Sequence, residues 1–295
     1  MAVESLSTAK LILPREVAKG IIRRSRDTST IQALSPSTPQ LFKDINHIIF
    51  SKEPEAEFVA EGAAKSPTSA EFTPVSGGVH KAQVTIRMNE EVQWADEDNQ
   101  LEIMDAIIDA AGGSLGRALD YGLYHAINPL TGTVIAGWNK LTAKGKAVTT
   151  TGNPQDDIDA LVDKINNDFD VNGLALSKQL ANDMRKLRIG STGQRVYPDI
   201  PLNLQVGNVD GIASAVSGTV NGRLATSPTK VLGILGDFSN IKWGVVRDLG
   251  MEVITQGDPD GLGDLKRYNQ VAYRTEIVYS WTVLDYNAFA VLKAV

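Results

Sequence analysis

Cysteine is absent from all 295 residues, which excludes disulfide bonds and thiolate chemistry. No apolar run approaches the roughly 18 residues of a membrane-spanning helix. The first residues also lack the basic-then-apolar pattern of a secretory signal. Histidine is scarce, and His47, His80 and His125 lie far apart in no spacing typical of metal ligands. These absences are compatible with a cytosolic protein, and the 42% of hydrophobic residues is enough for a core.

Common catalytic motifs are missing as well. The sequence has no Gly-x-Ser-x-Gly elbow, no P-loop and no Rossmann glycine triplet. Ser227 and Lys230 have the spacing of a serine–lysine pair, but so short a pattern often occurs by chance. We therefore predict a protein that is not an enzyme and that has no cofactor and no metal centre.

One acidic segment resembles the start of a calcium-binding loop. It runs from Asp258 to Asp264 and reads DPDGLGD. Its twelfth position is Asn269, which cannot supply a bidentate carboxylate, and Leu262 occupies a ligand position. We interpret the segment as a solvated acidic turn.

The net charge of −6 is unevenly distributed. Residues 14–26 hold five basic residues against one acid, and residues 50–109 hold thirteen acids against four bases. A basic segment ahead of an acidic body indicates contacts between copies or with another polyanion, although two ordinarily solvated surfaces would look the same. Basic and aromatic residues are not interleaved, so a single-stranded nucleic-acid platform is not expected.

The stretch from Asp96 to Ile127 organises the rest of the chain. Apolar residues recur every three or four positions on one helical face, at Leu101, Met104, Ile108, Ala111, Leu115, Leu119 and Ala126. Acidic residues crowd the first turns, and Pro129 follows the last. About 30 residues at 1.5 Å each predict a helix of roughly 45 Å.

Glycines interrupt this helix at Gly112, Gly113 and Gly116. Each glycine costs a helix up to about 1 kcal/mol relative to alanine. They indicate either close packing of the backbone against a sheet or a bend point in a long helix.

Residues 1–45 have the composition of an arm, and residues 46–79 that of a long hairpin. Pro14 can open a short helix in the arm. The hairpin is predicted from strand-like pieces at Glu57–Gly62 and Glu71–Val75, and Pro74 indicates an edge position. An isolated hairpin is barely stable in water, so the ribbon should rest on a neighbouring surface within or between chains.

Two further stretches alternate as half-buried strands. Lys81–Val92 leads into the long helix, and Val271–Val283 lies near the end of the chain. We predict that these two strands pair beneath the helix. Tyr286–Leu292 is predicted to be a final strand.

Residues 130–264 contain short elements and many glycines. Asn153 and Ser177 are predicted to cap helices, the second running through Arg188. Strands are expected at Gly173–Leu176, Val231–Leu235 and Lys242–Val246. This alternation predicts a compact α/β-like layer inserted between the two parts of the other sheet.

In this order, the elements resemble a major capsid protein of tailed bacteriophages, of the Hong Kong 97 type. The local pieces are AEFVAEGAAKSPTSAEFTPV for the family's extended loop, KAQVTIRMNEEV before its long spine helix, GILGDFSNIKWGVV for a strand-turn-strand, and YNQVAYRTEIVYSWTVLDYNAFAVLKA for the closing strands. Each piece is weak alone, and their order over nearly the whole chain makes the resemblance specific.

The resemblance implies an α+β fold with four parts. These are an N-terminal arm at residues 1–45, an extended loop at 46–79, a peripheral domain with the spine helix at 80–131 and 265–284, and an axial domain at 132–264 and 285–295. It implies self-assembly as hexamers and pentamers into an icosahedral virion shell around double-stranded DNA, formed in the host bacterial cytoplasm.

The implied contacts are mostly between copies of the chain. The loop would lie over one neighbour through Phe58, Glu61, Lys65 and Phe72, and the arm would clasp another through Arg23, Arg24 and Arg26. Further implied partners are a portal protein, a decoration protein and DNA bound without sequence specificity, with no membrane. The folded pattern begins almost at once, so we expect a separate scaffolding protein.

Two finer hypotheses follow from the resemblance. Some family members cross-link a loop lysine to an asparagine of a neighbour, and Lys65 lies in the loop tip, although its partners cannot be matched. Shells of this family expand as DNA enters and the helix straightens, so Gly112 and Gly113 are candidates for a bend point.

Other classes of protein stay open. An encapsulin-like shell that encloses protein cargo shares the fold, and a neighbouring terminase or portal gene would separate it from a phage capsid. A soluble hydrolase would need a discrete substrate pocket. A phage tail or adhesin component would form fibres or tubes.

Overall fold

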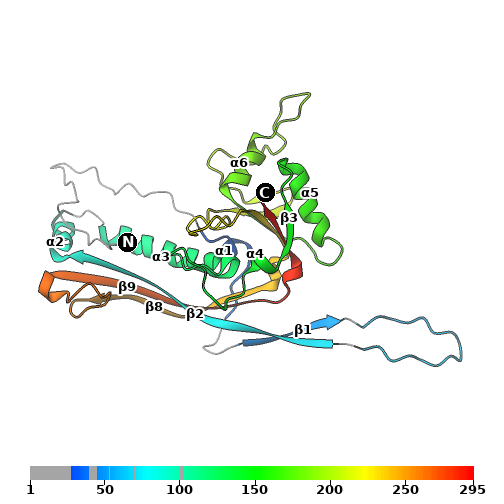
Figure 1. Ribbon diagram of the computed structural model, residues 1–295, viewed down its shortest axis with the longest axis horizontal. Coiled ribbons are helices and arrows are strands. Elements are labelled where there is room, and N and C mark those ends of the chain that lie inside the picture. Colours follow the sequence, from blue (N-terminus) through cyan, green and yellow to red (C-terminus); the bar gives the residue numbers. More distant parts are fainter. Residues whose placement is uncertain (1–27, 40–44, 53, 70, 100–102) are drawn as a thin grey trace.

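Two β-sheets form the framework of the chain (Figure 1). The computed structural model describes residues 28–39, 45–52, 54–69, 71–99 and 103–295. One sheet has four strands in the order β1-β2-β9-β8, and the other has six in the order β3-β10-β7-β4-β6-β5. A long helical segment lies along the four-stranded sheet (Figure 1).

The centre of the four-stranded sheet is the antiparallel pair of β2 (Glu71–Asn89) and β9 (Gln270–Val283). Their register runs from Gly78 opposite Trp281 to Asn89 opposite Gln270. The predicted pairing of the two alternating strands is therefore confirmed. β8 (Ile241–Ile254) lies on the outer side of β9.

The spine helix differs from its predicted bounds. Helical structure begins with α2 (Glu90–Asn99), so the strand expected to reach Val92 ends three residues earlier. It continues with α3 (Ile103–Asp120) and ends in a π-helical turn, Tyr121–His125. Residues 100–102, in the middle of the predicted helix, lie outside the described residues.

Most of the predicted apolar face of the spine is directed at the sheet, but Ile108 is 43% exposed and its neighbour Ile107 is buried instead. Ala111, Leu115 and Leu119 are buried, and the hydroxyl of Tyr279 on β9 donates to the carbonyl of Leu115 at 3.1 Å. At the far end of α3, Ile107 packs with Met88 of β2. The spine thus covers β2 and β9 along one face of the sheet.

The six-stranded sheet carries helices α5 (Pro154–Ile165) and α6 (Lys178–Lys186). Asn153 and Ser177 cap these helices through their side chains, as predicted, and α6 ends two residues before the expected Arg188. The strands are β3 (Lys146–Thr149), β4 (Gly173–Leu176), β5 (Asn208–Val209), β6 (Ile212–Val216), β7 (Val231–Gly236) and β10 (Phe289–Lys293). The remaining short helices are α1 (Thr30–Leu34) and α4 (Leu141–Lys144).

The chain passes between the two sheets earlier than the sequence indicates. A short turn, Phe238–Asn240, joins β7 of the six-stranded sheet directly to β8 of the four-stranded sheet. Residues 241–254 therefore belong with the spine and β9, whereas the sequence assigned everything up to residue 264 to the middle segment. The final strand also begins later than expected, at Phe289, after the turn Tyr286–Ala288.

Candidate assembly surfaces

The extended loop projects far beyond both sheets (Figure 1). It is carried by a ribbon in which β1 (Ile45–Lys52) pairs antiparallel with the first half of β2. Every residue from 54 to 69 is exposed. Hydrogen bonds within the loop join its two limbs, from Ser66 to the Glu57 carboxylate and from Thr68 to the carbonyl of Glu55.

The hairpin was predicted with partly wrong strands. Residues 57–62 form no strand, and the true partner of the second limb is β1, with Ile48 opposite Pro74. Pro74 lies where β2 pairs with β1 alone, because pairing with β9 begins only at Gly78. The position is compatible with a residue that has no N–H to donate.

The four predicted contact residues of the loop all lie at its surface. Phe58 is completely exposed at 106%, and Phe72 is 58% exposed. Glu61 and Lys65 are also exposed. Large apolar side chains in this position have no core to enter in their own chain, which is typical of an interaction surface.

The arm residues Arg23, Arg24 and Arg26 lie outside the described residues. The described part begins at Thr28, and α1 attaches it to the end of the spine. Gln32 of α1 lies next to Gly116, where an added Cβ would be 3.5 Å from the glutamine Oε1.

A buried carboxylate fixes this attachment. Asp120, at the end of α3, is completely buried. It accepts hydrogen bonds from the hydroxyls of Ser29 (2.5 Å), Thr30 (3.0 Å) and Thr219 (2.5 Å), and from the backbone amides of Thr30 (2.8 Å) and Ile31 (3.2 Å). Burial raises the pKa of Asp120, and these hydrogen bonds oppose the shift. The carboxylate thus joins the arm, the spine and the segment before β7.

Sequence reasoning missed Asp120. A negative charge in the last turn of a helix interacts unfavourably with the helix dipole. The position of Asp120 at the end of α3 was therefore the one local sign that its carboxylate has a specific partner. Its five hydrogen bonds come from segments about 90 and 99 positions away, which no local pattern predicts.

His125 continues the same network. It is buried, and its Nε2 lies 3.1 Å from the carbonyl of Thr219 and 3.0 Å from that of Val220. Carbonyl oxygens only accept, so Nε2 carries the proton. Burial lowers the pKa of His125 to about 4, which keeps the ring neutral. His125 therefore has a structural role, in linking the end of the spine to Thr219 and Val220.

His80 lies at the base of the ribbon between two tryptophans. Its ring centroid is 4.0 Å from those of both Trp138 and Trp281. Gly122 of the π-helical turn makes room for this group, because an added Cβ would lie 2.8 Å from the Trp281 ring. The cluster joins the ribbon, the spine and β9.

Gly112 and Gly113 occupy a different environment from Gly122. A Cβ added at Gly112 would meet nothing within 4 Å, and one at Gly113 would approach only the Arg117 guanidinium, at 3.4 Å. Close packing against the sheet, the first explanation for these glycines, is therefore wrong. The bend-point hypothesis stays a prediction.

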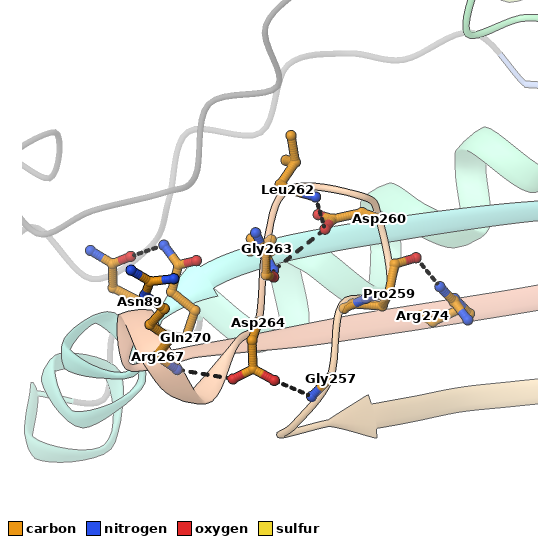
Figure 2. Close-up of polar contacts among 11 residues, drawn as sticks. Asn89, Gly257, Pro259, Asp260, Leu262, Gly263, Asp264, Arg267, Gln270 and Arg274 are labelled. Carbon is orange, nitrogen blue, oxygen red and sulfur yellow. Dashed lines mark hydrogen bonds and ion pairs between the residues drawn. The ribbon is translucent and has the colours of Figure 1, made fainter.

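The acidic segment resembling a calcium loop folds over the sheet face opposite the spine (Figure 2). The Asp264 carboxylate accepts from the amides of Gly257 and Arg267 at 3.2 and 3.0 Å. The Asp260 carboxylate accepts from the amide of Leu262 and lies 3.4 Å from Arg87 Nη2.

Two arginines on the strands of the sheet bind this segment through its backbone carbonyls. Arg87 of β2 donates to the carbonyl of Gly263, and Arg274 of β9 donates to that of Pro259 at 2.7 Å. The turn is thus exposed to solvent, as expected, and its backbone is hydrogen-bonded to the sheet beneath it.

A pocket of about 470 Å³ lies beside the six-stranded sheet. Ser227 lines it together with Lys140 and Lys293. Lys230, the proposed partner of Ser227, instead donates to the carbonyl of Val295 at 3.0 Å. In the described part of the chain, no group of three or more His, Cys, Asp or Glu residues is arranged to hold a metal. None of the described helices is long and apolar enough to cross a membrane.

Comparison with known proteins gives the family. The model of the phage capsid family matches residues 9–294. The chain belongs to the phage capsid family. No curated protein matches it.

Solved structures share this fold over nearly the full length of the chain. A chain from Mycobacterium phage Ogopogo has a TM-score of 0.86 at 35% identity, with 99% of this chain and 100% of that chain covered. One from Gordonia phage Cozz has a TM-score of 0.82 at 27% identity, with 98% and 93% covered. The capsid of an empty GTA particle, computed with C5 symmetry, shares the fold with a TM-score of 0.64 at 14% identity and 99% coverage of both chains.

The family confirms the resemblance and the α+β fold of the Hong Kong 97 type. The protein is a major capsid protein, whose copies assemble with one another into the shell of a phage particle. This is a structural role in the virion. The exposed loop and the anchored arm are therefore candidates for the contacts between copies.

Proposed function

We propose that copies of this chain form hexamers and pentamers and close into an icosahedral shell around double-stranded DNA. Membership of the phage capsid family supports this function. The observation that carries it is the extended loop, which presents Phe58 fully exposed and away from its own core. Such a loop is stable only when another surface covers it.

The loop contacts are proposed from its exposed geometry, and the arm contacts from the basic sequence of the arm and the family resemblance. The loop at residues 46–79 lies over one neighbour through Phe58, Glu61, Lys65 and Phe72. The basic arm with Arg23, Arg24 and Arg26 contacts another neighbour. Each exposed ion pair contributes only about 0–1 kcal/mol, so apolar anchors repeated over many copies supply most of the stability.

We assign the two units of the chain to the peripheral and axial domains of the family. The unit built on the four-stranded sheet and the spine is peripheral, and the unit built on the six-stranded sheet is axial and lies at the centre of each capsomer. A portal protein, a separate scaffolding protein and a decoration protein are the proposed partners. Assembly takes place in the host bacterial cytoplasm, and DNA is held without sequence specificity.

Particle size and content test the proposal. The chain is produced alone and with the scaffolding protein of its own phage, and is examined by light scattering and negative-stain electron microscopy. Closed shells with pentameric and hexameric capsomers are expected, and particles purified from infected cells should contain nuclease-protected DNA. Chains that stay monomeric even with scaffold would contradict the proposal. Shells that protect protein cargo and no DNA would identify the encapsulin-like alternative.

A further inference from the structure

The edge of the four-stranded sheet is incompletely covered. β8 is an edge strand, and among the described residues only its first part has a neighbour on the outer side. There, the amide of Thr38 donates to the carbonyl of Trp243 at 2.8 Å, and the hydroxyl of Ser35 donates to that of Ile241 at 3.0 Å. Beyond Trp243, β9 is the one strand that pairs with β8 among the described residues. An edge of this kind is a template for another strand.

The uncovered part of β8 also presents apolar side chains. We call Val245, Leu249, Met251 and Val253 the β8 strip, and they are between 38% and 52% exposed. Three of them, Val245, Met251 and Val253, stand opposite Tyr279, Thr275 and Tyr273 of β9. They therefore share the sheet face that the spine helix packs on, but lie at its margin. Leu249 lies in the bulge between Asp248 and Gly250.

A segment with a matching pattern lies in the extended loop. Residues 55–61, EAEFVAE, alternate as a strand would, with Ala56, Phe58 and Ala60 on one side and the glutamates and Val59 on the other. All of them are exposed, and none belongs to a strand. In Figure 1 this loop and the outer half of β8 lie at opposite ends of the molecule, so the loop cannot reach the β8 strip of its own chain.

We propose that residues 55–61 of a second copy add to β8 as a fifth strand, with Phe58 packed on the β8 strip. This inference rests on the proposed function, in which the loop lies over a neighbour, and it names the receptor. The backbone bonds of the added strand supply affinity, and the alternating side chains set its facing.

Charge supports this facing. With Phe58 on the spine side, Glu57 and Glu61 are directed to the opposite face of the sheet. On that face β8 carries two basic residues, Lys242 and Arg247, opposite Thr282 and Val278 of β9, and one acid, Glu252, which stands opposite Arg274. Opposite charges on adjacent strands favour such a pairing.

Engineered cysteines test the contact, because the chain has none of its own. Ala60→Cys is combined in turn with Val245→Cys, Met251→Cys and Val253→Cys, in full-length chains assembled into shells. After mild oxidation, at least one pair should give dimers and larger ladders on a non-reducing gel. Each single cysteine variant, and Ala60→Cys with Asp163→Cys on the exposed side of α5, should stay monomeric on the gel.

Imaging the particles before oxidation distinguishes a failure of the proposed function from a failure of the strand addition. Wild-type chains that form no shells even with the scaffolding protein contradict the proposed function. Shells in which no β8 pair cross-links, or in which the Asp163 pair cross-links equally well, overturn the strand addition alone.

Charge reversal provides a second test that applies even when the cysteine variants do not close into shells. Arg247→Glu should lower the shell yield at least several-fold. Adding Glu57→Arg or Glu61→Arg to it should restore most of that yield. If neither double variant assembles better than Arg247→Glu alone, the proposed facing of the strand is wrong.

Discussion

The hydroxyl of Ser29 donates a hydrogen bond of 2.5 Å to the carboxylate of Asp120, 91 positions further along the chain. This bond places the start of α1 on the end of the spine helix. Ser29, the second described residue of the chain, is therefore held at a fixed point on the subunit. The contacts proposed between the arm and other copies would depend on this attachment.

Asp120→Ala should destabilise the subunit by about 3 kcal/mol. The substitution removes the buried acceptor of three hydroxyls and two backbone amides, although the hydroxyls of Thr30 and Thr219 keep Tyr124 and Ser217 as partners. Hydrogen bonds to a charged group contribute about 1.5–3 kcal/mol each, but the cost of burying the carboxylate, which the substitution also removes, offsets most of their sum. Urea unfolding of unassembled chains measures the change. Asp163→Ala, at an exposed position of α5, is the control and should alter stability by less than about 0.5 kcal/mol. Equal effects of both substitutions would contradict the anchoring role.

Stability should fall on acidification because of His125. Burial lowers the pKa of His125 from 6.5 to about 4. Between pH 6.5 and pH 4 the histidine is therefore protonated in the unfolded chain but mostly neutral in the folded chain. The contribution is complete above pH 6.5 and is lost as the pH falls toward 4, by up to about 1.4 kcal/mol per pH unit. Asp120 acts in the opposite sense, because its raised pKa favours the folded state when it is protonated.

Comparing His125→Gln with wild type isolates the histidine. Glutamine keeps an N–H donor for the carbonyls of Thr219 and Val220 but does not titrate. The difference in unfolding free energy between the two chains should shrink by about 2–3 kcal/mol between pH 6.5 and pH 4. His47→Gln, on β1, serves as the control. A difference that stays constant with pH would show that His125 does not titrate as argued.

Much of the fold follows from local patterns, and the exceptions have physical reasons. The pairing of β2 with β9 was predictable because one face of each strand is buried and alternates cleanly. The start of the spine was misplaced because the strand was extended to Val92, although Glu90 already breaks the alternation and lies with Glu91 in the first turn of α2. β8 was assigned to the wrong sheet because a three-residue turn, with no change in composition, separates it from β7.

Some of the candidate contact residues could likewise be predicted from local sequence patterns, and others could not. Phe58 and Phe72 were identified as surface anchors because aromatic residues in a polar loop stand out in a sequence. The β8 strip could not be found in this way, because Val245, Met251 and Val253 look like core residues until the width of the spine is known. Whether these side chains are exposed depends on β8, β9 and the spine helix together, because the helix covers only part of the sheet.

Replacing both Gly112 and Gly113 with alanine should stabilise the subunit by about 1–2 kcal/mol. Both positions have room for a Cβ, and alanine is the better helix former by up to about 1 kcal/mol per residue. If the glycines serve as a bend point, the double variant should also favour the straight spine and the expanded shell, which cryo-electron microscopy of particles would show.

Gly122→Ala is the matched control on the same spine. Its Cβ would press on the Trp281 ring at 2.8 Å, so it should destabilise the subunit by about 1–3 kcal/mol. A double variant at Gly112 and Gly113 that is as damaging as Gly122→Ala would show that these two glycines are also packing spacers. One that expands like wild type would exclude the bend point.

Calcium should not bind the acidic turn at residues 258–264. Asp264 is used by two backbone amides, Asp260 lies against Arg87, and Leu262 occupies a ligand position. Even a weak extracellular-type site would stabilise a protein by about 1 kcal/mol in millimolar calcium. Thermal unfolding in calcium and in EDTA should therefore give the same midpoint. A saturable rise with calcium would contradict this expectation.

Phe58→Ala should weaken assembly without weakening the subunit. Its ring is completely exposed in the isolated chain, so the unfolding free energy should change by less than about 0.5 kcal/mol. Burying a phenylalanine against a neighbour contributes about 1.5–3 kcal/mol, and its loss should raise the concentration needed for assembly by roughly tenfold to a hundredfold. Light scattering over a concentration series measures this threshold. Val59→Ala is the control, because Val59 is adjacent and lies on the other side of the alternating segment. Because only the side of the loop that bears Phe58 is expected to meet the neighbour's apolar surface, equal shifts for both variants would mean that the loop acts through its flexibility and not through an anchor.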